Sequence, residues 1–318
     1  MFYAQYDSPA GPLTLAAEGA ALTGLCFGPC SEPGADLPLF DDAFAWLDEY
    51  FAGRDPGPTP PLAPAGTAFQ QRVWQTLLTI PFGKTASYGQ IAQAVGCRSP
   101  RAVGQAVHNN PIALMIPCHR IIGSDGSLTG FAGGLDVKRR LLTLEESRMR
   151  LLFTLDRGDY QEGKKAFSRP SARAIVIEDG RVAMVYSKKY GHYKFPGGGI
   201  EKGEAREATL IREAREEAGL ILDPESVKPY GFVHRIEKGD REAVFLQDNF
   251  YYLASAVATV PQELDEYEAA EGYNLRWVDP GEAIEQDKAL TNEYKRRYHT
   301  MLLREAMVLE RLMGEGLL

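Results

Sequence analysis

The order of hydrophobic and polar positions divides the chain into segments with different predicted secondary structure. Short alternating runs over residues 13–17 and 22–27 predict antiparallel strands near the start. A helical stripe follows over 41–52, and the proline-rich stretch 55–64 predicts an irregular spacer, because proline lacks a backbone donor and fixes φ. The pattern therefore predicts a small β-rich subdomain over residues 1–64.

Residues 65–150 carry mainly helical patterns. Apolar positions recur at helical spacing from 69 to 78. A helix-turn-helix pattern follows, in which Gly96 lies in the turn, Ser99 caps the second helix and Pro100 begins it. Because helix pairs of this kind are common, the pattern is compatible with DNA binding but does not establish it.

From residue 151 onward the pattern alternates strands with helices. Two apolar runs on either side of Asp179 and Gly180 predict a β-hairpin. Strands that enclose one glycine-led helix are typical of an α+β sandwich. The predicted elements are the hairpin strands 172–177 and 182–186, a helix over about 205–218, strands around 244–260 and 273–278, and an amphipathic helix near 292–313.

Charge is unevenly distributed along the 318 residues, whose net charge is −8. The segment 1–64 has a net charge of −8, 65–150 has +6 and 151–318 has −6. A basic middle segment is expected if only that segment meets phosphate, although a chance fluctuation in surface charge is the alternative. No apolar run approaches the roughly 20 residues of a membrane span, and the start lacks a secretory pattern. We therefore expect a cytoplasmic protein with no membrane partner.

Cys118 and His119 place a thiol beside an imidazole within the apolar run 116–122. A nearby base can convert a buried, inert thiol into a nucleophile, whereas a core cysteine beside a hydrogen-bonded histidine is the simpler interpretation. The surrounding sequence favours the nucleophile. Residues 67–145 closely resemble the O6-alkylguanine-DNA alkyltransferase family, and residues 1–64 fit its N-terminal subdomain. The matching stretches are 69–74, 80–89, 101–104, 110–111, 117–120, 133–135 and 138–145.

The resemblance implies that Cys118 irreversibly accepts an alkyl group from O6-alkylguanine or O4-alkylthymine in DNA. His119 would take the thiol proton through a water, and Glu145 would hold the resulting imidazolium. Tyr88 would donate to the departing guanine, and Asn110 would brace the active-site turn. The transfer itself needs no metal or cofactor. A lesion sensor that does not react is the alternative, which the presence of Cys118 disfavours.

The resemblance also implies a double-stranded DNA partner, bound through the minor groove with the damaged base flipped out. Arg101 would replace the flipped base, and small residues of the recognition helix would allow close approach to the groove. The predicted DNA-contacting residues are Arg101, Ala102, Gly104 and Arg120, with Ala106 as a further small position. The family often has Tyr-Ser where this chain has Phe131 and Ala132, and Cys26 and Cys30 are interpreted as packing residues.

Glu213, Glu216 and Glu217 have the i, i+3, i+4 spacing that puts three carboxylates on one helical face. A solvated charged helix is the simpler interpretation, but the fixed glycines and acids from Gly198 to Leu220 match the Nudix box. This resemblance implies Mg²⁺, with Mn²⁺ as an alternative ion, and hydrolysis of a nucleoside diphosphate derivative. The residues implied at the metal are Glu213, Glu216, Glu217, Glu204 and Gly198, with Arg212 orienting Glu213 and with Glu266, Glu268 or Glu271 as a further ligand.

Together these features predict a multidomain protein of mixed α/β and α+β class. We expect a ribonuclease H-like β subdomain over 1–64, a helical helix-turn-helix subdomain over 65–150 and a Nudix α/β/α sandwich over 151–318. The fused repair domain suggests a damaged nucleoside triphosphate as the Nudix substrate. A Nudix fold that serves only as a nucleotide-binding regulatory module is the alternative.

Overall fold

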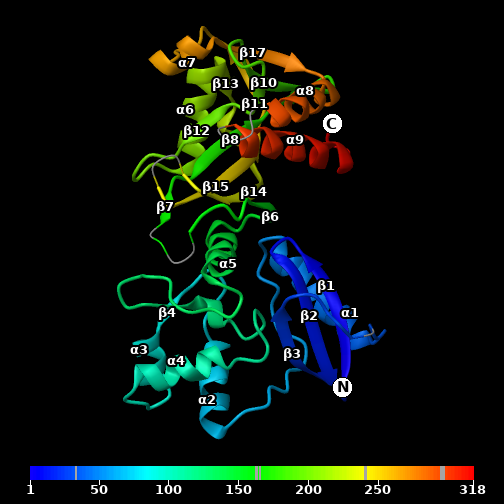
Figure 1. Ribbon diagram of the computed structural model, residues 1–318, viewed down its shortest axis with the longest axis vertical. Coiled ribbons are helices and arrows are strands. Elements are labelled where there is room, and N and C mark those ends of the chain that lie inside the picture. Colours follow the sequence, from blue (N-terminus) through cyan, green and yellow to red (C-terminus); the bar gives the residue numbers. More distant parts are fainter. Residues whose placement is uncertain (33, 162–163, 165, 240–241, 294–297) are drawn as a thin grey trace. The chain divides into compact units, whose positions relative to one another are not determined.

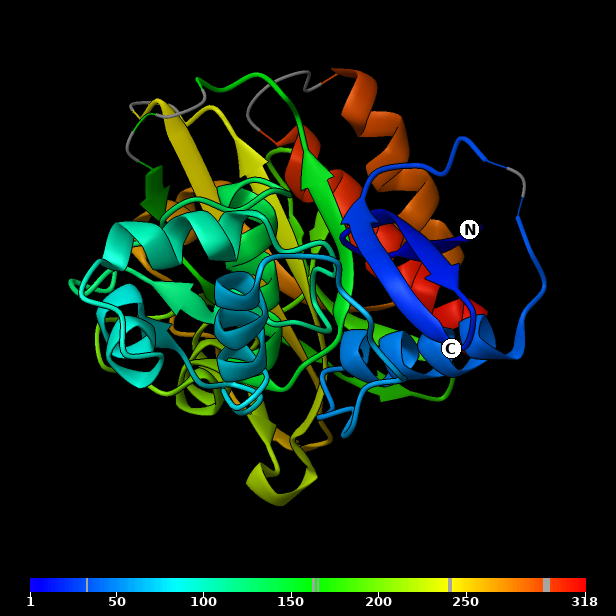
Figure 2. The ribbon, with the colours of Figure 1, turned by 90° about the horizontal axis from the view of Figure 1, so that it is seen from below.

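The computed structural model describes residues 1–318 except 33, 162–163, 165, 240–241 and 294–297. The chain forms two compact units, Met1–Leu151 and Leu152–Leu318. Figure 1 labels their helices and strands, and Figure 2 shows the same ribbon from a second direction. Within the described residues, no helix has both the length and the apolar character needed to cross a membrane.

The first unit begins with a three-stranded antiparallel sheet in the order β1-β2-β3, with helix α1 beside it (Figure 1). Alternation along the middle strand buries Leu13 and Leu15 completely, and α1 buries Leu47 and Tyr50 completely. The second and third strands were predicted from this alternation. The bounds are β1 Phe2–Ser8, β2 Gly11–Glu18, β3 Ala21–Phe27 and α1 Pro38–Phe51.

The rest of the first unit is helical, and the predicted helix-turn-helix is confirmed as α3 and α4. The Ser87 hydroxyl accepts from the Gln90 backbone in a capping box at the start of α3. The Ser99 side chain caps α4 by accepting from the Ala102 backbone, and Pro100 occupies the first turn of that helix. The elements are α2 Ala68–Leu77, β4 Ala86–Ser87, α3 Tyr88–Ala94, α4 Pro100–His108, the 3-10 turn η1 Cys118–Arg120, β5 Ile121–Ile122 and α5 Leu135–Ser147.

The second unit contains two main sheets. The larger has the order β12-β8-β15-β14-β6, with β7 beside β15, and the smaller has the order β11-β10-β17, with β9 beside β10. Strands β13 and β16 form a separate pair. The strands are β6 Leu151–Asp156, β7 Ala166–Ser168, β8 Ser171–Ile175, β9 Ile177–Glu178, β10 Arg181–Ser187, β11 Tyr193–Lys194, β12 Gly197–Gly199, β13 Leu220–Leu222, β14 Lys228–Glu237, β15 Val244–Leu253, β16 Ala256–Thr259 and β17 Tyr273–Val278.

Helices cover both faces of the larger sheet, as the predicted α/β/α sandwich requires. Tyr251 of β15 packs in one core cluster with Val308 and Leu309 of α9. Its neighbour Phe250 instead lies under Arg206 of α6, with the guanidinium carbon 4.2 Å from the ring centroid. Successive strand side chains point to opposite faces, so α6 and α9 lie on opposite sides. The helices are α6 Arg206–Ala218, η2 Pro224–Ser226, α7 Glu266–Glu271, α8 Pro280–Glu293 and α9 His299–Gly314.

Two sequence predictions for the second unit need correction, and two of its elements were not predicted. The predicted hairpin exists only as the short pair β9 and β10, because β8 belongs to the other sheet, where it pairs with β12 and β15. Strand β14 and helix α8 were not predicted. The predicted final helix begins at His299, and residues 294–297 of its predicted range lie outside the described residues.

Candidate active sites

Cys118 begins the 3-10 turn η1 and is buried, with 6% of its surface exposed. The loop before it contains Leu114 at φ 66°, a left-handed conformation that costs energy for a side chain of this kind. Asn110 holds this loop from within: its side-chain nitrogen donates to the Ile116 carbonyl at 2.8 Å, and its oxygen accepts from the Ile112 backbone at 3.1 Å. This amide side chain therefore holds the turn that carries the thiol together with backbone hydrogen bonds, such as that from Cys118 to the Ile116 carbonyl at 2.7 Å.

Burial sets the protonation states of Cys118 and His119. Burial raises the pKa of the Cys118 thiol, while the Asn110 amide and the Lys138 ammonium act in the opposite direction. Burial also lowers the pKa of His119, and this outweighs the favourable effect of Glu145 on the imidazolium. At neutral pH both shifts favour a thiol beside a neutral imidazole.

The neutral imidazole has a defined tautomer. His119 Nε2 lies 2.6 Å from Glu145 Oε1. Burial alone would raise the pKa of Glu145, but His119 and Arg120 lower it to about 2, so this side chain is a carboxylate and can only accept. Nε2 must then donate, which leaves Nδ1 as a proton acceptor. That atom is buried and has no hydrogen-bond partner among the described residues.

Glu145 accepts five hydrogen bonds and is the centre of this network. The donors besides His119 are the Tyr50 hydroxyl at 2.9 Å, the Gly83 backbone at 3.0 Å, and Arg120 Nε and Nη2 at 2.8 and 3.1 Å. Charge-assisted bonds of this kind hold the carboxylate in one orientation.

The placement of Arg120 corrects one prediction. Its side chain is 9% exposed, and its Nη1 donates to the Ile80 carbonyl at 2.7 Å in addition to the two bonds to Glu145. The prediction that Arg120 contacts DNA is therefore wrong, because the guanidinium is buried and committed to the relay. Sequence inspection missed this role, since a basic residue in a basic segment is most simply interpreted as a phosphate contact.

Two further polar residues of this site were not predicted. Tyr50 lies in the helix that the sequence predicts over 41–52, where no role at the site was expected for it. Lys138 donates to the Ile121 carbonyl and, at 2.7 Å, to the Thr129 carbonyl, and burial lowers its pKa to about 8. Its fully buried ammonium lies near enough to Cys118 to act on the thiol pKa. Neither residue stands close to Cys118 in the sequence.

The predicted recognition helix α4 places its small residues unequally. Arg101 is exposed and Ala102 and Gly104 are half-buried, so these residues are available at the surface. Ala106 is buried, and its carbonyl accepts from the Trp74 indole at 2.8 Å, so its predicted approach to a groove is wrong. Tyr88 lies beside this helix, since a Cβ on Gly104 would be 3.6 Å from its ring.

The hydroxyl of Tyr88 accepts a hydrogen bond of 3.2 Å from the Thr129 side chain.

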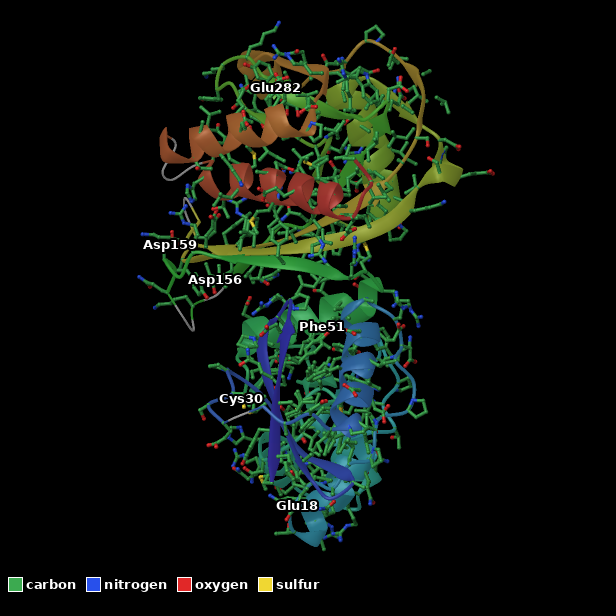
Figure 3. All side chains as sticks on the ribbon, turned by 90° about the vertical axis from the view of Figure 1, so that its right-hand side faces the viewer. Glu18, Cys30, Phe51, Asp156, Asp159 and Glu282 are labelled. Atoms are coloured by element: carbon green, nitrogen blue, oxygen red, sulfur yellow. The ribbon has the colours of Figure 1, made fainter. Side chains whose placement is uncertain are left out.

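The two N-terminal cysteines differ from expectation. Cys26 is exposed and Cys30 is only half-buried (Figure 3 labels Cys30), so they are not the core packing residues that the sequence predicted.

In the second unit, strand β12 brings a glycine backbone against helix α6. A Cβ on Gly198 would lie 2.3 Å from the Glu213 carboxyl carbon, and one on Gly197, at φ 141°, would lie 2.1 Å from the Ala172 carbonyl oxygen. Only glycine allows approaches this close. The glycines of the predicted motif therefore let the acidic face of α6 meet the strand.

Arg212 bridges three of the predicted acidic residues. Its Nη1 donates to Glu213 at 2.8 Å and to Glu216 at 2.9 Å, and its Nε donates to Glu204 at 2.9 Å. Burial raises the pKa of Glu213, and repulsion from Glu217 raises it further. The carboxylates are thus crowded, and one guanidinium relieves part of their repulsion.

Glu217 faces a different set of partners. Lys194 Nζ donates to Glu217 at 2.5 Å, and the backbone N–H of Gly197 donates to the same carboxylate at 3.1 Å. Burial and contact with Glu217 raise the pKa of Glu268 to about 7. Of the three candidates outside the box, Glu268 lies at this site, whereas Glu266 is exposed and Glu271 accepts from the Tyr298 hydroxyl.

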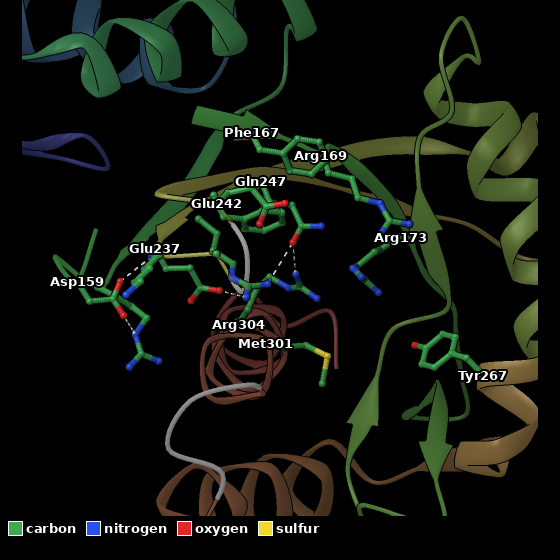
Figure 4. A pocket seen from close by; sticks show the side chains of 15 residues that line it. Asp159, Phe167, Arg169, Arg173, Glu237, Glu242, Gln247, Tyr267, Met301 and Arg304 are labelled. Atoms are coloured by element: carbon green, nitrogen blue, oxygen red, sulfur yellow. Dashed lines mark hydrogen bonds and ion pairs between the residues drawn. The ribbon is translucent and has the colours of Figure 1, made fainter. Parts of the chain in front are cut away.

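The carboxylates of Glu213, Glu216, Glu217 and Glu268 line one cavity of about 450 Å³. Figure 4 shows a neighbouring pocket that shares part of this lining. As the side chains stand, no three acidic, histidine or cysteine residues of the described chain converge closely enough to hold an ion. The donor set nevertheless fits a hard divalent cation, because it consists of carboxylate oxygens whose mutual repulsion a cation would relieve. The acidic residues at the cavity are Glu201, Glu213, Glu216, Glu217, Glu263, Asp265 and Glu268.

Comparisons with known proteins agree with this division of the chain. Residues 1–63 match the family model for the 6-O-methylguanine DNA methyltransferase ribonuclease-like domain, and residues 68–147 match that for its DNA binding domain. Residues 168–301 match the NUDIX domain model.

Individual relatives match one part of the chain each. A methylated-DNA–protein-cysteine methyltransferase of Mycobacterium bovis is 49% identical over 153 residues, covering 46% of this chain and 93% of the relative. The crystal structure of Mycobacterium tuberculosis OGT in complex with DNA is 47% identical, covers 47% of this chain and 96% of that one, and has a TM-score of 0.44. A NUDIX hydrolase from Nitrosomonas europaea is 20% identical, covers 38% and 79%, and has a TM-score of 0.32.

Proposed function

Since this chain belongs to the methylated-DNA–protein-cysteine methyltransferase family and carries a NUDIX domain after that region, we propose that it combines two separate activities. The first unit removes alkyl groups from bases in double-stranded DNA. The second hydrolyses a nucleoside diphosphate derivative. Each activity has its own residues, and no residue is shared between the two sites.

The proposal for the first unit rests on the buried arrangement of Cys118, His119 and Glu145. His119 Nδ1 is an acceptor without a partner among the described residues, and it belongs to the residue next to the thiol. It takes the thiol proton through a water as the sulfur attacks the alkyl carbon of O6-alkylguanine. The new S–C bond forms as the C–O6 bond breaks, and the electron pair of that bond passes to the guanine.

The remaining residues act on the departing base and on DNA. Tyr88 donates a proton to the guanine as it leaves, so the base departs neutral. Arg101, Ala102 and Gly104 on helix α4 meet the minor groove, and Arg101 fills the place of the flipped base. O4-alkylthymine offers the same exocyclic alkoxy group and is a second substrate.

Mass spectrometry of the whole chain tests the alkyl transfer. After exposure to a duplex oligonucleotide with one O6-methylguanine, the protein should gain about 14 Da, the mass of one CH₂, on the peptide that contains Cys118. Binding of the duplex without any mass gain would instead identify the chain as a lesion sensor.

For the second unit we propose hydrolysis supported by Mg²⁺, with Mn²⁺ as an alternative. Glu213, Glu216 and Glu217 would hold the ion and activate the attacking water, and Glu204 would support them through Arg212. The ion, when bound, neutralises phosphate charge and lowers the pKa of the attacking water. Glu268, which lines the same cavity, would accept a proton from the attacking water as the water oxygen bonds to phosphorus and the P–O bond to the leaving phosphate breaks.

A hydrolysis screen of nucleoside diphosphate derivatives and damaged nucleoside triphosphates with Mg²⁺ tests this activity. We expect products that end in a phosphate monoester, and no product when a chelator is present. If the chain binds these nucleotides but releases no product, the second unit is a regulatory nucleotide-binding module.

A further inference from the structure

Thr129 contacts the hydroxyl that the proposed alkyl transfer uses as its proton donor. Tyr88 begins helix α3 and is half-buried. Its hydroxyl accepts the 3.2 Å hydrogen bond from the Thr129 hydroxyl, which lies 41 positions later, in the loop between β5 and α5. Thr129 is the only hydrogen-bond partner of the Tyr88 hydroxyl among the described residues. A residue outside the motifs at the thiol therefore touches the proposed donor directly.

The direction of this hydrogen bond suits proton donation. A phenol hydroxyl has one proton to give and two lone pairs. Because Thr129 donates to the phenol oxygen, one lone pair is engaged while the Tyr88 proton stays free for the departing guanine. A hydrogen bond accepted at the oxygen also polarises the O–H bond and makes it a stronger donor. The contact thus orients the Tyr88 proton and favours its transfer.

The same contact strengthens as the reaction proceeds. When Tyr88 gives up its proton, its oxygen becomes a phenolate, and the Thr129 hydroxyl then donates to an anion. Charge-assisted hydrogen bonds are roughly twice as strong as neutral ones. An interaction that grows with the developing charge lowers the barrier, because it stabilises the transition state more than the ground state.

The Thr129 backbone is held by a buried ammonium. The Thr129 carbonyl accepts from Lys138 Nζ at 2.7 Å, and the fully buried Lys138 also donates to the Ile121 carbonyl. Ile121 directly follows the turn η1 that begins with Cys118. Burying an ammonium costs free energy unless its N–H groups find acceptors, so both carbonyls stay bound to it. Lys138 therefore ties the loop of Thr129 to the strand that follows the thiol.

The Tyr88 ring is confined at its other end by helix α4. A Cβ on Gly104 would lie 3.6 Å from this ring, which is ordinary van der Waals contact. Helix α4 therefore limits where the ring lies, and Thr129 contacts the hydroxyl at its tip. Two separate elements thus locate one phenol group.

We propose that Thr129 is a positioning residue for the alkyl transfer, whose hydroxyl directs the Tyr88 proton towards the departing base and stabilises the phenolate oxygen that forms. This inference rests on the role of Tyr88 in the proposed function of the first unit. The sulfur of Cys118 bonds to the alkyl carbon as the C–O6 bond breaks, and the electron pair of that bond passes to the guanine. The Tyr88 proton neutralises the guanine, and the phenolate regains a proton from water once the base has left.

Thr129→Val tests the inference, because it removes the hydroxyl and keeps the branched shape. Single-turnover methyl transfer from a duplex with one O6-methylguanine should slow by about three- to tenfold, as the loss of one hydrogen bond predicts. Thr129→Ser keeps the donor and should stay within about twofold of the unchanged protein. Affinity for the same duplex, measured in a Cys118→Ser background where no transfer occurs, should not change in Thr129→Val.

A double-mutant cycle with Tyr88→Phe separates positioning from a general structural role. Phenylalanine has no proton to direct, so Thr129→Val should cause no further slowing in that background. A Thr129→Val effect that persists in Tyr88→Phe would overturn the inference. So would a full rate in Thr129→Val, or equal slowing in Thr129→Val and Thr129→Ser.

Thr79→Val is the matched control, because the Thr79 hydroxyl donates only to the Thr76 carbonyl of its own turn. It should transfer at the full rate. Thermal unfolding is measured for every variant, and Thr129→Ala replaces Thr129→Val if the valine destabilises the fold. A full rate in Tyr88→Phe refutes the proposed role of Tyr88 itself. Slow transfer by Tyr88→Phe with a full rate in Thr129→Val overturns the role of Thr129 alone.

Discussion

The Tyr50 hydroxyl donates a 2.9 Å hydrogen bond to Glu145 Oε1, although the two residues lie 95 positions apart in the chain. Tyr50 comes from helix α1 beside the N-terminal sheet, and Glu145 comes from α5. The same hydroxyl lies 3.2 Å from His119 Nε2. Helix α1 therefore contributes a side chain to the hydrogen-bond network of His119 and Glu145 beside Cys118.

Tyr50→Phe should weaken both stability and alkyl transfer. Removing the hydroxyl deletes one of the donors to Glu145, which we expect to cost about 1 kcal/mol of unfolding free energy and to slow transfer several-fold. Urea unfolding and single-turnover methyl transfer measure the two effects. Tyr6→Phe is the control, because Tyr6 donates to Asp48 on the exposed side of the same helix. Equal transfer rates in both variants would show that Tyr50 has no role in the relay.

Cys118→Ser should abolish methyl uptake and leave nucleotide hydrolysis unchanged, since the two sites share no residue. Serine is a much weaker nucleophile at the same position. The readouts are the mass of the protein after exposure to methylated duplex and phosphate release with Mg²⁺. Cys97→Ser, at a half-buried cysteine outside the relay, should keep both activities. Loss of both activities in Cys118→Ser would contradict the separation of the sites.

Arg120→Met and Arg101→Gln should fail in different ways. Arg120→Met leaves the buried Glu145 carboxylate without its guanidinium, which we expect to cost about 3–5 kcal/mol of stability. Arg101→Gln changes an exposed residue, so the free energy of unfolding should stay constant. DNA affinity should fall, and the slope of log affinity against log salt concentration should become shallower by about one. Thermal unfolding and binding titrations at several salt concentrations separate the two. A stable Arg120→Met protein with reduced salt dependence would restore the DNA-contact prediction.

The first unit should lose stability at acidic pH because of Glu145. Its pKa in the folded protein is about 2, below the ordinary glutamate pKa of 4.5, so the carboxylate stabilises the fold above pH 4.5. As pH falls from 4.5 towards 2 the folded state must take up a proton that the unfolded state already holds, and about 3 kcal/mol is lost. Urea unfolding of the first unit at pH 6, 4 and 3 measures this. An unfolding free energy that stays constant below pH 4.5 would contradict this role of Glu145.

Glu216→Gln should reduce Mg²⁺-dependent hydrolysis by about 10²-fold or more, because it removes one carboxylate charge from the proposed metal site. Methyl transfer by Cys118 should be unaffected. Glu207→Gln is the matched control on the exposed surface of the same helix and should hydrolyse normally. Full hydrolysis by Glu216→Gln would remove this residue from the proposed site.

Local patterns explain why some elements could be predicted from the sequence. The Ser99 cap, the following Pro100 and the glycine turn define helix α4 within a few residues, and the structure begins the helix at Pro100. Strand β14, by contrast, is buried over most of its length and lacks the alternation of a half-exposed strand, so it gave no period-two signal. The pairing of β8 with β15 joins residues more than 70 positions apart, which no hairpin signal can reveal.

The candidate sites also contain residues that local sequence patterns predict and residues that only tertiary packing brings together. Glu213, Glu216 and Arg212 lie within one helix, so their meeting could be expected from helical spacing alone. Tyr50 and Arg120 reach Glu145 only because three separate elements pack together. Their side chains carry no local feature that distinguishes a relay residue from a core tyrosine or a surface arginine.

Arg212 also determines what happens to the second unit when divalent ions are withdrawn. Its guanidinium already contacts Glu204, Glu213 and Glu216, so a positive charge belonging to the chain itself remains among these acids. We therefore expect this unit to fold without an added cation. Chelation should switch off turnover reversibly while the protein keeps its melting temperature, and activity should return on simple addition of the ion without refolding.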